Sequence, residues 1–317
     1  MTTIDAEPKA RTVSVNPPSL LDLRSASPER IVRLLTAARG FDTDAPPAPP
    51  TGLTVANLFF EDSTRTRVSF SIAAHRIGVT PLELDMESSS RSKGETLDDT
   101  ARTIAAMGVD AMVVRSREPG GPAIVGRAVG CPVISAGDGR HEHPTQGLLD
   151  AYTVAEAHGL LGSFDLAGLR VAVVGDAANS RVARSDVAAF TKLGAEVVVV
   201  GPPSMAPASL AALGCEVSED FDGVIGTIDA VQMLRVQRER GGATGSLRSY
   251  TMGYQLTPER EARMKDGAIV MHPGPMNRGV EIHPDAADGE RSRIERQVSV
   301  GVLVRMAALS EALGGAA

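Results

Sequence analysis

Hydroxyl and guanidinium side chains are concentrated between Glu61 and Arg67, in the order Glu-Asp-Ser-Thr-Arg-Thr-Arg. The apolar run over 53–60 predicts a strand before this segment, and the spacing over 68–77 predicts a helix after it. The head of a helix offers free backbone N–H groups and the positive end of the helix dipole, which favour a bound phosphate. Further donors, including a guanidinium that can bridge two phosphate oxygens, come from Ser63, Thr64, Thr66 and Arg65. An ordinary helix cap beside solvated arginines is the alternative.

A second polar segment, His141 to Gln146, contains His-Glu-His-Pro-Thr-Gln. Two histidines two positions apart on a strand can share a metal ion, yet no third ligand with a suitable partner stands out, so we expect no metal here. His143 stands before a proline at the head of a predicted helix over 143–157. There it is suited to donate a hydrogen bond to a substrate oxygen and so to assist attack at a carbonyl carbon. Gln146, one turn further on, is expected to reach the same pocket.

Three arginines, Arg115, Arg181 and Arg235, each follow an apolar run that predicts a strand. In open parallel sheets, ligands bind outside the carboxyl ends of the strands. The position of Arg115 directly after its strand therefore favours a role in the site over a charge on the solvated surface.

The elements that must position these residues alternate along the chain. Short apolar runs adjoin stretches with helical period, and they cover 53–60, 111–114, 133–134, 171–175, 197–201 and 268–271. Such alternation predicts an α/β protein with mostly parallel sheets and crossover helices. Because 317 residues exceed what one hydrophobic core usually serves, two domains are expected. We place them at 1–149 and 150–292, each a mostly parallel sheet flanked by helices, with a C-terminal helix within 293–317 that packs back on the first.

The composition restricts the class of protein. The net charge is -7 and no long basic run occurs, which argues against a nucleic-acid surface. No apolar run reaches the length of a membrane span, and Met1 to Leu20 lacks the pattern of a signal peptide, so neither membrane insertion nor secretion is expected. The two cysteines, Cys131 and Cys215, stand far apart in apolar surroundings that are typical of reduced, buried thiols. A cytoplasmic protein is therefore expected.

Segments 63–67 and 143–146 together resemble the carbamoyl-phosphate site of the aspartate and ornithine carbamoyltransferase family. The similarity to its aspartate branch extends from about residue 53 to residue 309. The resemblance implies that the carbamoyl phosphate is bound by Ser63, Thr64, Arg65, Thr66, Arg115, His143 and Gln146. Thr66, Arg115 and His143 would face the carbonyl oxygen, where negative charge develops during attack, and Gln146 would hold the carbamoyl amino group.

The polar segment 88–96 is either a solvated loop or part of the site. In the family, the matching loop reaches the active site of the neighbouring subunit, where positions like Ser89 and Lys93 contact substrate. The resemblance thus implies a homotrimer with shared active sites, in which the lysine acts as a movable point charge. It leaves further assembly with regulatory chains or a dihydroorotase open.

The second half of the site decides which amine is carbamoylated. Aspartate has two carboxylates that call for arginines, whereas ornithine has a distal ammonium that arginines repel. The resemblance implies that aspartate is bound by Lys93, Arg181, Arg235, Gln237, Pro273, Gly274 and Pro275, with a cis bond before Pro275. The ornithine branch usually carries Ser-Met-Gly and His-Cys-Leu-Pro at the corresponding places, and this chain has neither. Glu61 and Arg240 match a pair that bridges the two domains on closure.

The activity that the resemblance implies is transfer of the carbamoyl group from carbamoyl phosphate to L-aspartate, an early step of pyrimidine biosynthesis, without a metal or another cofactor. The residues expected to act in catalysis are Arg65, Thr66, Lys93, Arg115 and His143. Three alternatives stay open: a carbamoyltransferase for ornithine or an unusual amine, an inactive relative that binds anions, and a nucleotide-binding protein. The last is suggested by the strand before Gly175, which lacks the Gly-x-Gly-x-x-Gly turn.

Overall fold

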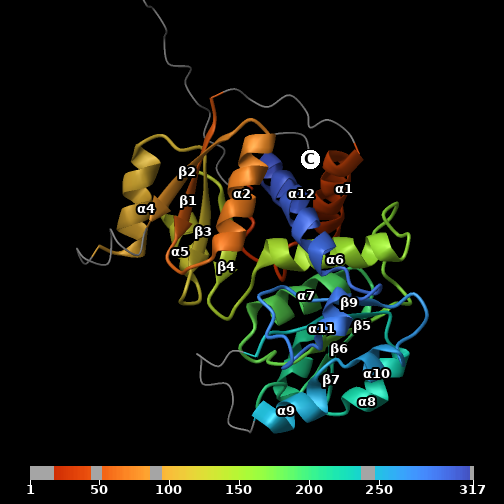
Figure 1. The fold of residues 1–317 in the computed structure, drawn as a ribbon. Coiled ribbons are helices and arrows are strands. Elements are labelled where there is room, and N and C mark those ends of the chain that lie inside the picture. The colour runs from red at the N-terminus through yellow and green to blue at the C-terminus, as the bar shows by residue number, and fades with distance from the viewer. Residues whose placement is uncertain (1–17, 44–51, 86–94, 237–246, 315–317) are drawn as a thin grey trace, which may run out of the picture.

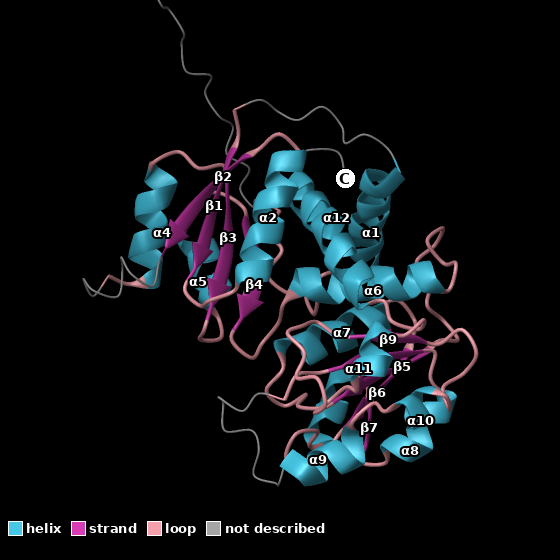
Figure 2. Ribbon diagram, viewed as in Figure 1, coloured by secondary structure: helices cyan, strands magenta, loops and turns pink. Residues whose placement is uncertain are grey.

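The computed structural model describes residues 18–43, 52–85, 95–236 and 247–314. It has two lobes, each built on a parallel sheet (Figure 1). Figure 2 shows helices on both faces of the first sheet, with α4 and α5 on one face and α2 and α12 on the other. This arrangement confirms the predicted α/β fold with two parallel sheets.

The first sheet has the strand order β2-β1-β3-β4, and all its neighbouring strands are parallel. Helices connect its successive strands, because parallel neighbours need a crossover connection. In chain order its elements are α1 (Pro28–Thr43), β1 (Thr54–Phe59), α2 (Thr64–Arg76), β2 (Thr80–Asp85), α4 (Leu97–Ala106), β3 (Ala111–Ser116), α5 (Gly121–Ala128) and β4 (Val133–Asp138).

The second sheet has the order β7-β6-β5-β8-β9 and is also parallel throughout. Its elements are β5 (Arg170–Val174), α7 (Arg181–Lys192), β6 (Glu196–Val200), β7 (Glu216–Ser218), α8 (Phe221–Val224), β8 (Ala230–Met233), α9 (Leu247–Tyr254), α10 (Pro258–Glu261), β9 (Ile269–Met271) and α11 (Pro284–Asp288). Two short 3-10 helices, Ala208–Leu213 and Ile225–Thr227, complete this lobe.

Two helices join the lobes. Helix α6 (Pro144–Ala157) leads from the first sheet to the second, and the predicted domain boundary between residues 149 and 150 falls inside it. Helix α12 (Ile294–Ala312) returns to the first lobe, where it lies between α1 and α2 in Figure 1 and also packs on α6. The expectation that the C-terminal helix packs back on the first domain is therefore confirmed.

The cores follow the alternation of the strands. Val55 and Val113 belong to a cluster that packs against α1, α2 and α12, whereas Ala56 and Met112 belong to the cluster under α4 and α5. Both faces of a sheet with crossover helices are buried, which is why its strands are near-continuous apolar runs in the sequence. The first cluster continues through α6 and α7 into the second lobe, so the two lobes share part of one core.

The structure differs from the sequence prediction at several elements, among them one helix and two strands. Helix α2 begins at Thr64, four residues before the predicted start, because the polar Thr-Arg-Thr-Arg stretch forms its first turn. Strands β2 and β7 were not predicted. Both are edge strands, and β2 contains Pro81, which an edge strand tolerates because one side of it needs no partner.

Candidate active site

The carboxyl ends of β1, β3 and β4 in the first sheet and of β5, β8 and β9 in the second lead to one cavity of about 510 Å³. Every predicted substrate-binding residue that the structure describes lines it. These residues are Ser63, Thr64, Arg65, Thr66, Arg115, His143 and Gln146 from the first lobe and its α6 extension, and Arg181, Arg235, Pro273, Gly274 and Pro275 from the second. Glu61 also lines the cavity. The structure therefore brings together residues as far apart in the sequence as Ser63 and Pro275.

Four predicted residues cannot be placed. Ser89 and Lys93 fall in 86–94, and Gln237 and Arg240 fall in 237–246, so all four lie outside the described residues. The predicted roles of these residues stay predictions.

The head of α2 forms the anion-binding wall of the cavity. Ser63 precedes the helix and makes no side-chain capping bond, and the N–H groups of Thr64, Arg65 and Thr66 in the first turn have no acceptor within the helix. Partial burial and the nearby guanidinium of Arg235 lower the pKa of Arg65. Because two cations from different lobes face each other here, an anion between them relieves their repulsion.

A carboxylate joins cations of the two lobes. Nη2 of Arg115, at the end of β3, donates to Oε1 of Glu61 over 3.0 Å, and Nη2 of Arg181, at the head of α7, donates to the same oxygen over 2.5 Å. All three side chains are nearly buried. Nη1 of Arg115 also donates to the carbonyl of Ala136 over 3.0 Å, which fixes the plane of its guanidinium.

Gly137 leaves the room that these two arginines occupy. It lies in β4 with φ of 127°, a backbone conformation that residues with a side chain rarely adopt. A Cβ at this position would lie 2.9 Å from Nη1 of Arg115 and 2.9 Å from Nη1 of Arg181. The sequence prediction missed this residue because the predicted apolar run covered only 133–134, whereas β4 extends to Asp138. A glycine inside a strand is a known sign of close approach by another group.

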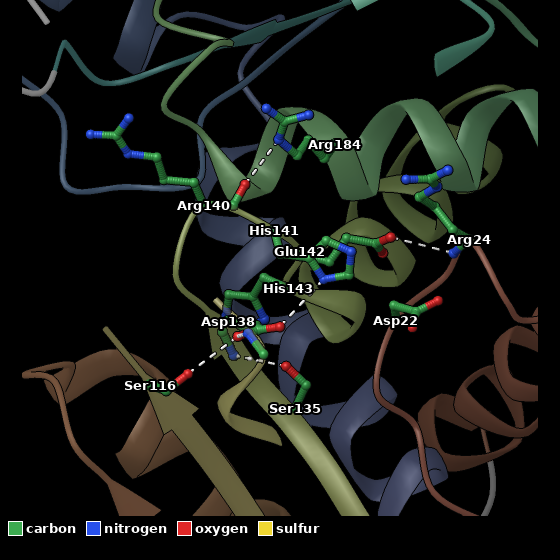
Figure 3. Close-up of polar contacts among 12 residues, drawn as sticks. Asp22, Arg24, Ser116, Ser135, Asp138, Arg140, His141, Glu142, His143 and Arg184 are labelled. Carbon is green, nitrogen blue, oxygen red and sulfur yellow. Dashed lines mark hydrogen bonds and ion pairs between the residues drawn. The ribbon is translucent and has the colours of Figure 1, made fainter. Parts of the chain in front are cut away.

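The turn that carries His143 is fixed from several sides (Figure 3). Oδ1 of Asp138 accepts from Ser116 Oγ over 3.2 Å, and Glu142 accepts from the backbone N–H of Leu23 over 2.7 Å. The N–H of His143 itself donates to Ser185 Oγ of α7 over 2.7 Å. Contacts with both lobes therefore position the imidazole at the head of α6.

The electrostatic surroundings keep His143 neutral. Burial, followed by the charges of Arg115, Arg305 and Arg181, lowers the pKa of His143 well below its usual value. Its Nδ1 is enclosed and has no hydrogen-bond partner among the described residues. A neutral imidazole can donate one hydrogen bond to a carbonyl oxygen without adding a further positive charge to the site.

The neighbouring histidine lies beside a carboxylate. His141 is partly exposed, and its Nδ1 lies 3.3 Å from Oδ2 of Asp138. Within the described ranges, no three His, Cys, Asp or Glu side chains are grouped so that they could hold a metal ion.

Arg305 is a further cation of the cavity that the sequence prediction missed. It projects from α12, is 5% exposed, and lies with its guanidinium carbon 5.3 Å from the centre of the Phe70 ring. Burial lowers the pKa of Arg305 to about 10, and the carboxyl of Asp150 partly offsets this effect. Residues 300–309 are small or apolar except for Arg305. This single arginine was the signal available in the sequence.

The wall from the second lobe is a turn after β9. The bond between Gly274 and Pro275 is cis, as predicted, and Gly274 packs against the guanidinium of Arg65. His272 holds the turn, because its Nδ1 accepts from the N–H of Gly274 over 2.8 Å while its Nε2 lies 3.3 Å from Glu281 Oε1. This places the turn opposite the anion-binding wall.

The cavity as a whole is strongly positive. Among the described residues that line it are five arginines and two acidic side chains, and these are Arg65, Arg115, Arg181, Arg235, Arg305, Glu61 and Asp62. Such a cavity suits two anionic ligands bound side by side, one against each lobe.

Known proteins match both lobes. Residues 19–156 match the carbamoyl-P binding domain of the aspartate/ornithine carbamoyltransferases, and residues 167–311 match their Asp/Orn binding domain. An aspartate carbamoyltransferase catalytic subunit of Gluconacetobacter diazotrophicus is 48% identical over 297 residues, which cover 92% of this chain and 91% of the relative. One of Thermobifida fusca is 52% identical over 267 residues, or 84% of each chain.

Solved structures of both branches share the fold. Aspartate transcarbamoylase of Trypanosoma cruzi, in complex with N-(phosphonacetyl)-L-aspartic acid, has a TM-score of 0.81 at 28% identity, over 94% of this chain and 96% of that one. Ornithine carbamoyltransferase of Pyrococcus furiosus has a TM-score of 0.80 at 28% identity, over 96% and 99%. Sequence and structure thus agree, and this chain belongs to the aspartate/ornithine carbamoyltransferase family.

Proposed function

We infer that the chain is an aspartate carbamoyltransferase, which transfers the carbamoyl group of carbamoyl phosphate to L-aspartate and yields N-carbamoyl-L-aspartate and phosphate, an early step of pyrimidine biosynthesis. The observation that carries this conclusion is the single cavity in which an anion-binding helix head of one lobe faces two arginines of the other. The relatives that are 48% and 52% identical to this chain are aspartate carbamoyltransferase catalytic subunits. We propose that residues 1–149, completed by 293–317, bind carbamoyl phosphate and that 150–292 bind aspartate.

The chemistry needs positioned donors rather than a covalent intermediate. The phosphate lies on Ser63 to Thr66 at the head of α2, and the carbonyl oxygen faces Thr66, Arg115 and His143. The neutral amine of aspartate attacks the carbonyl carbon, a C–N bond forms, the C–O bond to phosphate breaks, and the amine proton leaves with the phosphate. Donors already in place stabilise the charge on the carbonyl oxygen, and holding the two substrates together supplies most of the remaining rate. We expect no metal or other cofactor to take part.

The choice of aspartate rests on the second lobe. Arg181 would bind the α-carboxylate and Arg235 the side-chain carboxylate, while the backbone carbonyls of the Pro273–Pro275 turn would accept from the amino group. A distal ammonium, such as that of ornithine, would be repelled by Arg235. Gln237 would assist Arg235.

Closure of the lobes is linked to Glu61. We predicted that it pairs with Arg240 on closure, and that partner lies outside the described residues. In the structure Glu61 already joins Arg115 of the first lobe to Arg181 of the second. A substrate carboxylate that approaches Arg181 competes with Glu61 for this arginine. Binding of aspartate would therefore change the contact between the lobes.

We further propose a homotrimer in which Ser89 and Lys93 of one subunit complete the site of the next. An exposed apolar patch along α2 and β2 supports a subunit contact there, because Val68, Ile72 and Leu82 are each at least 40% exposed. Mixing inactive Lys93→Ala and His143→Ala variants, with a step that exchanges subunits, is expected to restore activity. Mixing without subunit exchange is the control, and no recovery after proven exchange would contradict shared sites.

A cytoplasmic location is also part of the proposal. None of the helices in the described part of the chain is long and apolar enough to span a membrane. Cys215 is a buried thiol whose pKa is raised by burial, which suits a reducing compartment.

The function is tested by incubating the purified protein with carbamoyl phosphate and either L-aspartate or L-ornithine. We expect carbamoyl-aspartate, detected by mass spectrometry, and no citrulline. Formation of citrulline instead would assign the chain to the ornithine branch, and an unchanged rate in the His143→Ala variant would contradict the role of His143.

A further inference from the structure

A buried polar network lies directly behind Gln146. The carboxylate of Asp150, one turn further along α6, accepts from Nε2 of Gln146 over 3.0 and 3.1 Å. It also accepts from Nε2 of Gln232 in β8 over 2.9 Å and from Nε2 of Gln297 in α12 over 2.6 Å. All four side chains are at most 8% exposed. Three amide groups from both lobes therefore donate to a single carboxylate.

A second acid, Asp186 of α7, touches this network. It is fully buried, and neither of its oxygens accepts a well-formed hydrogen bond from the described residues. Its polar neighbours are Asp150, which adds to the effect of burial and raises the pKa of Asp186, and Gln232, which partly offsets that effect. Two buried carboxylates in contact cannot both be ionised, because each would face an unscreened like charge. Burial, together with the charge of Asp150, raises the pKa of Asp186.

We propose that Asp150 is a positioning residue that fixes which end of the Gln146 amide faces the substrate, and that Asp186 stays protonated and donates its hydrogen to Asp150.

The orientation of Gln146 matters because the two ends of a carboxamide have almost the same shape and opposite hydrogen-bonding character. A carboxylate only accepts, so Asp150 holds the NH₂ end of Gln146 away from the cavity. The oxygen of Gln146 is then the end presented to the carbamoyl amino group, which donates. This step rests on the proposed function, since it takes the amino group of carbamoyl phosphate as the partner of Gln146.

The network also reaches the second wall of the site. Oε1 of Gln297 accepts from the backbone N–H of His272 over 2.9 Å, next to the turn over 273–275. Burial raises the pKa of Asp150 to about 6, and its hydrogen bonds together with the charge of Arg305 on α12 partly offset this effect. Asp150 is thus a carboxylate that accepts hydrogen bonds from side chains of both lobes, and it lies behind the residues that contact the substrates.

The test compares carbamoyl phosphate with inorganic phosphate as ligands of an Asp150→Asn variant. An asparagine introduces an NH₂ group at the point where three amide NH₂ groups converge. The side-chain amide of Gln146 then rotates, so that its oxygen accepts from the asparagine and its NH₂ group faces the substrate. We expect the Kd of carbamoyl phosphate, measured by calorimetry, to rise by about tenfold or more, because a donor then faces a donor. Inorganic phosphate has no amino group, and its Kd is expected to change by less than about twofold. A purely structural role would weaken both ligands alike.

A second pair of variants tests the proton on Asp186 even if Asp150→Asn does not fold. Asp186→Asn keeps a donor in the same shape, whereas Asp186→Leu keeps only the volume. We expect Asp186→Asn to bind carbamoyl phosphate within about twofold of the wild type, and Asp186→Leu to bind it several-fold more weakly with phosphate unaffected. Thr153→Val is the matched control, because Thr153 is buried in the same helix and its hydroxyl donates only to Leu149 O, over 2.8 Å.

Equal weakening of both ligands, unchanged binding of carbamoyl phosphate, or an Asp186→Asn variant as impaired as Asp186→Leu would each overturn the proposal. Wild-type turnover of aspartate is measured separately. An inactive wild-type protein would refute the proposed function, whereas an active one with an unaffected Asp150→Asn variant would refute the positioning role alone.

Discussion

Replacing Gly137 by alanine tests whether the two arginines of the site are held where the chemistry needs them. A Cβ at residue 137 would lie 2.9 Å from Nη1 of both Arg115 and Arg181, and real Cβ atoms essentially never come within 3.0 Å of another group. An ordinary contact is about 3.5 Å, so each guanidinium must move by roughly 0.6 Å. Both groups also hold Glu61, so the shift disturbs the contact between the lobes.

The expected losses follow from that displacement. A misplacement near 1 Å costs about 100-fold in rate, so we expect kcat/KM of Gly137→Ala to fall by roughly 10- to 100-fold. The backbone at φ of 127° adds a strain of about 1–3 kcal/mol, which appears in urea unfolding. Steady-state rates with each substrate varied in turn, together with unfolding curves, measure the two effects separately.

Gly108→Ala is the matched control. Gly108 has φ of 92°, and nothing lies within 4 Å of the position of its Cβ. We expect a stability loss of about 1 kcal/mol and no change in kcat/KM beyond about twofold. A Gly137→Ala variant as active as Gly108→Ala would refute the argument that this glycine makes room for the arginines.

Three further predictions concern the charges of the site. Arg235→Ala is expected to raise the KM for aspartate by about 100-fold through loss of a charge-assisted pair, and an unchanged KM would place the side-chain carboxylate elsewhere. Glu61→Gln leaves two nearly buried guanidinium groups facing each other and is expected to lower the free energy of unfolding in urea by about 3 kcal/mol. An unchanged free energy of unfolding would show that the pair with Arg181 contributes nothing. The pKa of His143 lies below its usual 6.5, so the folded state holds the neutral imidazole. The neutral imidazole contributes fully to stability above pH 6.5, and this contribution is lost as the pH falls below that value. An NMR titration in which the ring of His143 protonates near pH 6.5 would contradict the assignment.

The sequence was sufficient to predict the fold class because both sheets are parallel. Buried strands such as β1, β5 and β6 are nearly continuous apolar runs, and polar functional groups follow β1 and β5. Strands β2 and β7 could not be predicted, since β2 contains a proline and β7, with the sequence Glu-Val-Ser, has a single apolar residue.

The sequence prediction named candidate residues that stand in short polar motifs, and it missed residues that only packing brings to the cavity. Arg65 and His143 stand in short polar segments that are recognisable in isolation. By contrast, Arg305 and Asp150 stand among small or apolar residues of their helices. Only the packing of α6 and α12 shows that Arg305 lines the cavity and that Asp150 lies behind Gln146. The partners of Glu61 likewise depend on how close the two lobes lie, and the sequence contains no measure of that distance.

The most direct test of the two-lobe site is a crystal structure with a bisubstrate analogue in which a phosphonate is joined to L-aspartate. We predict that the phosphonate lies at the head of α2, on Ser63 to Thr66, and that the two carboxylates pair with Arg181 and Arg235. A phosphonate bound elsewhere, or carboxylates that contact neither arginine, would contradict the assignment of the two lobes to the two substrates.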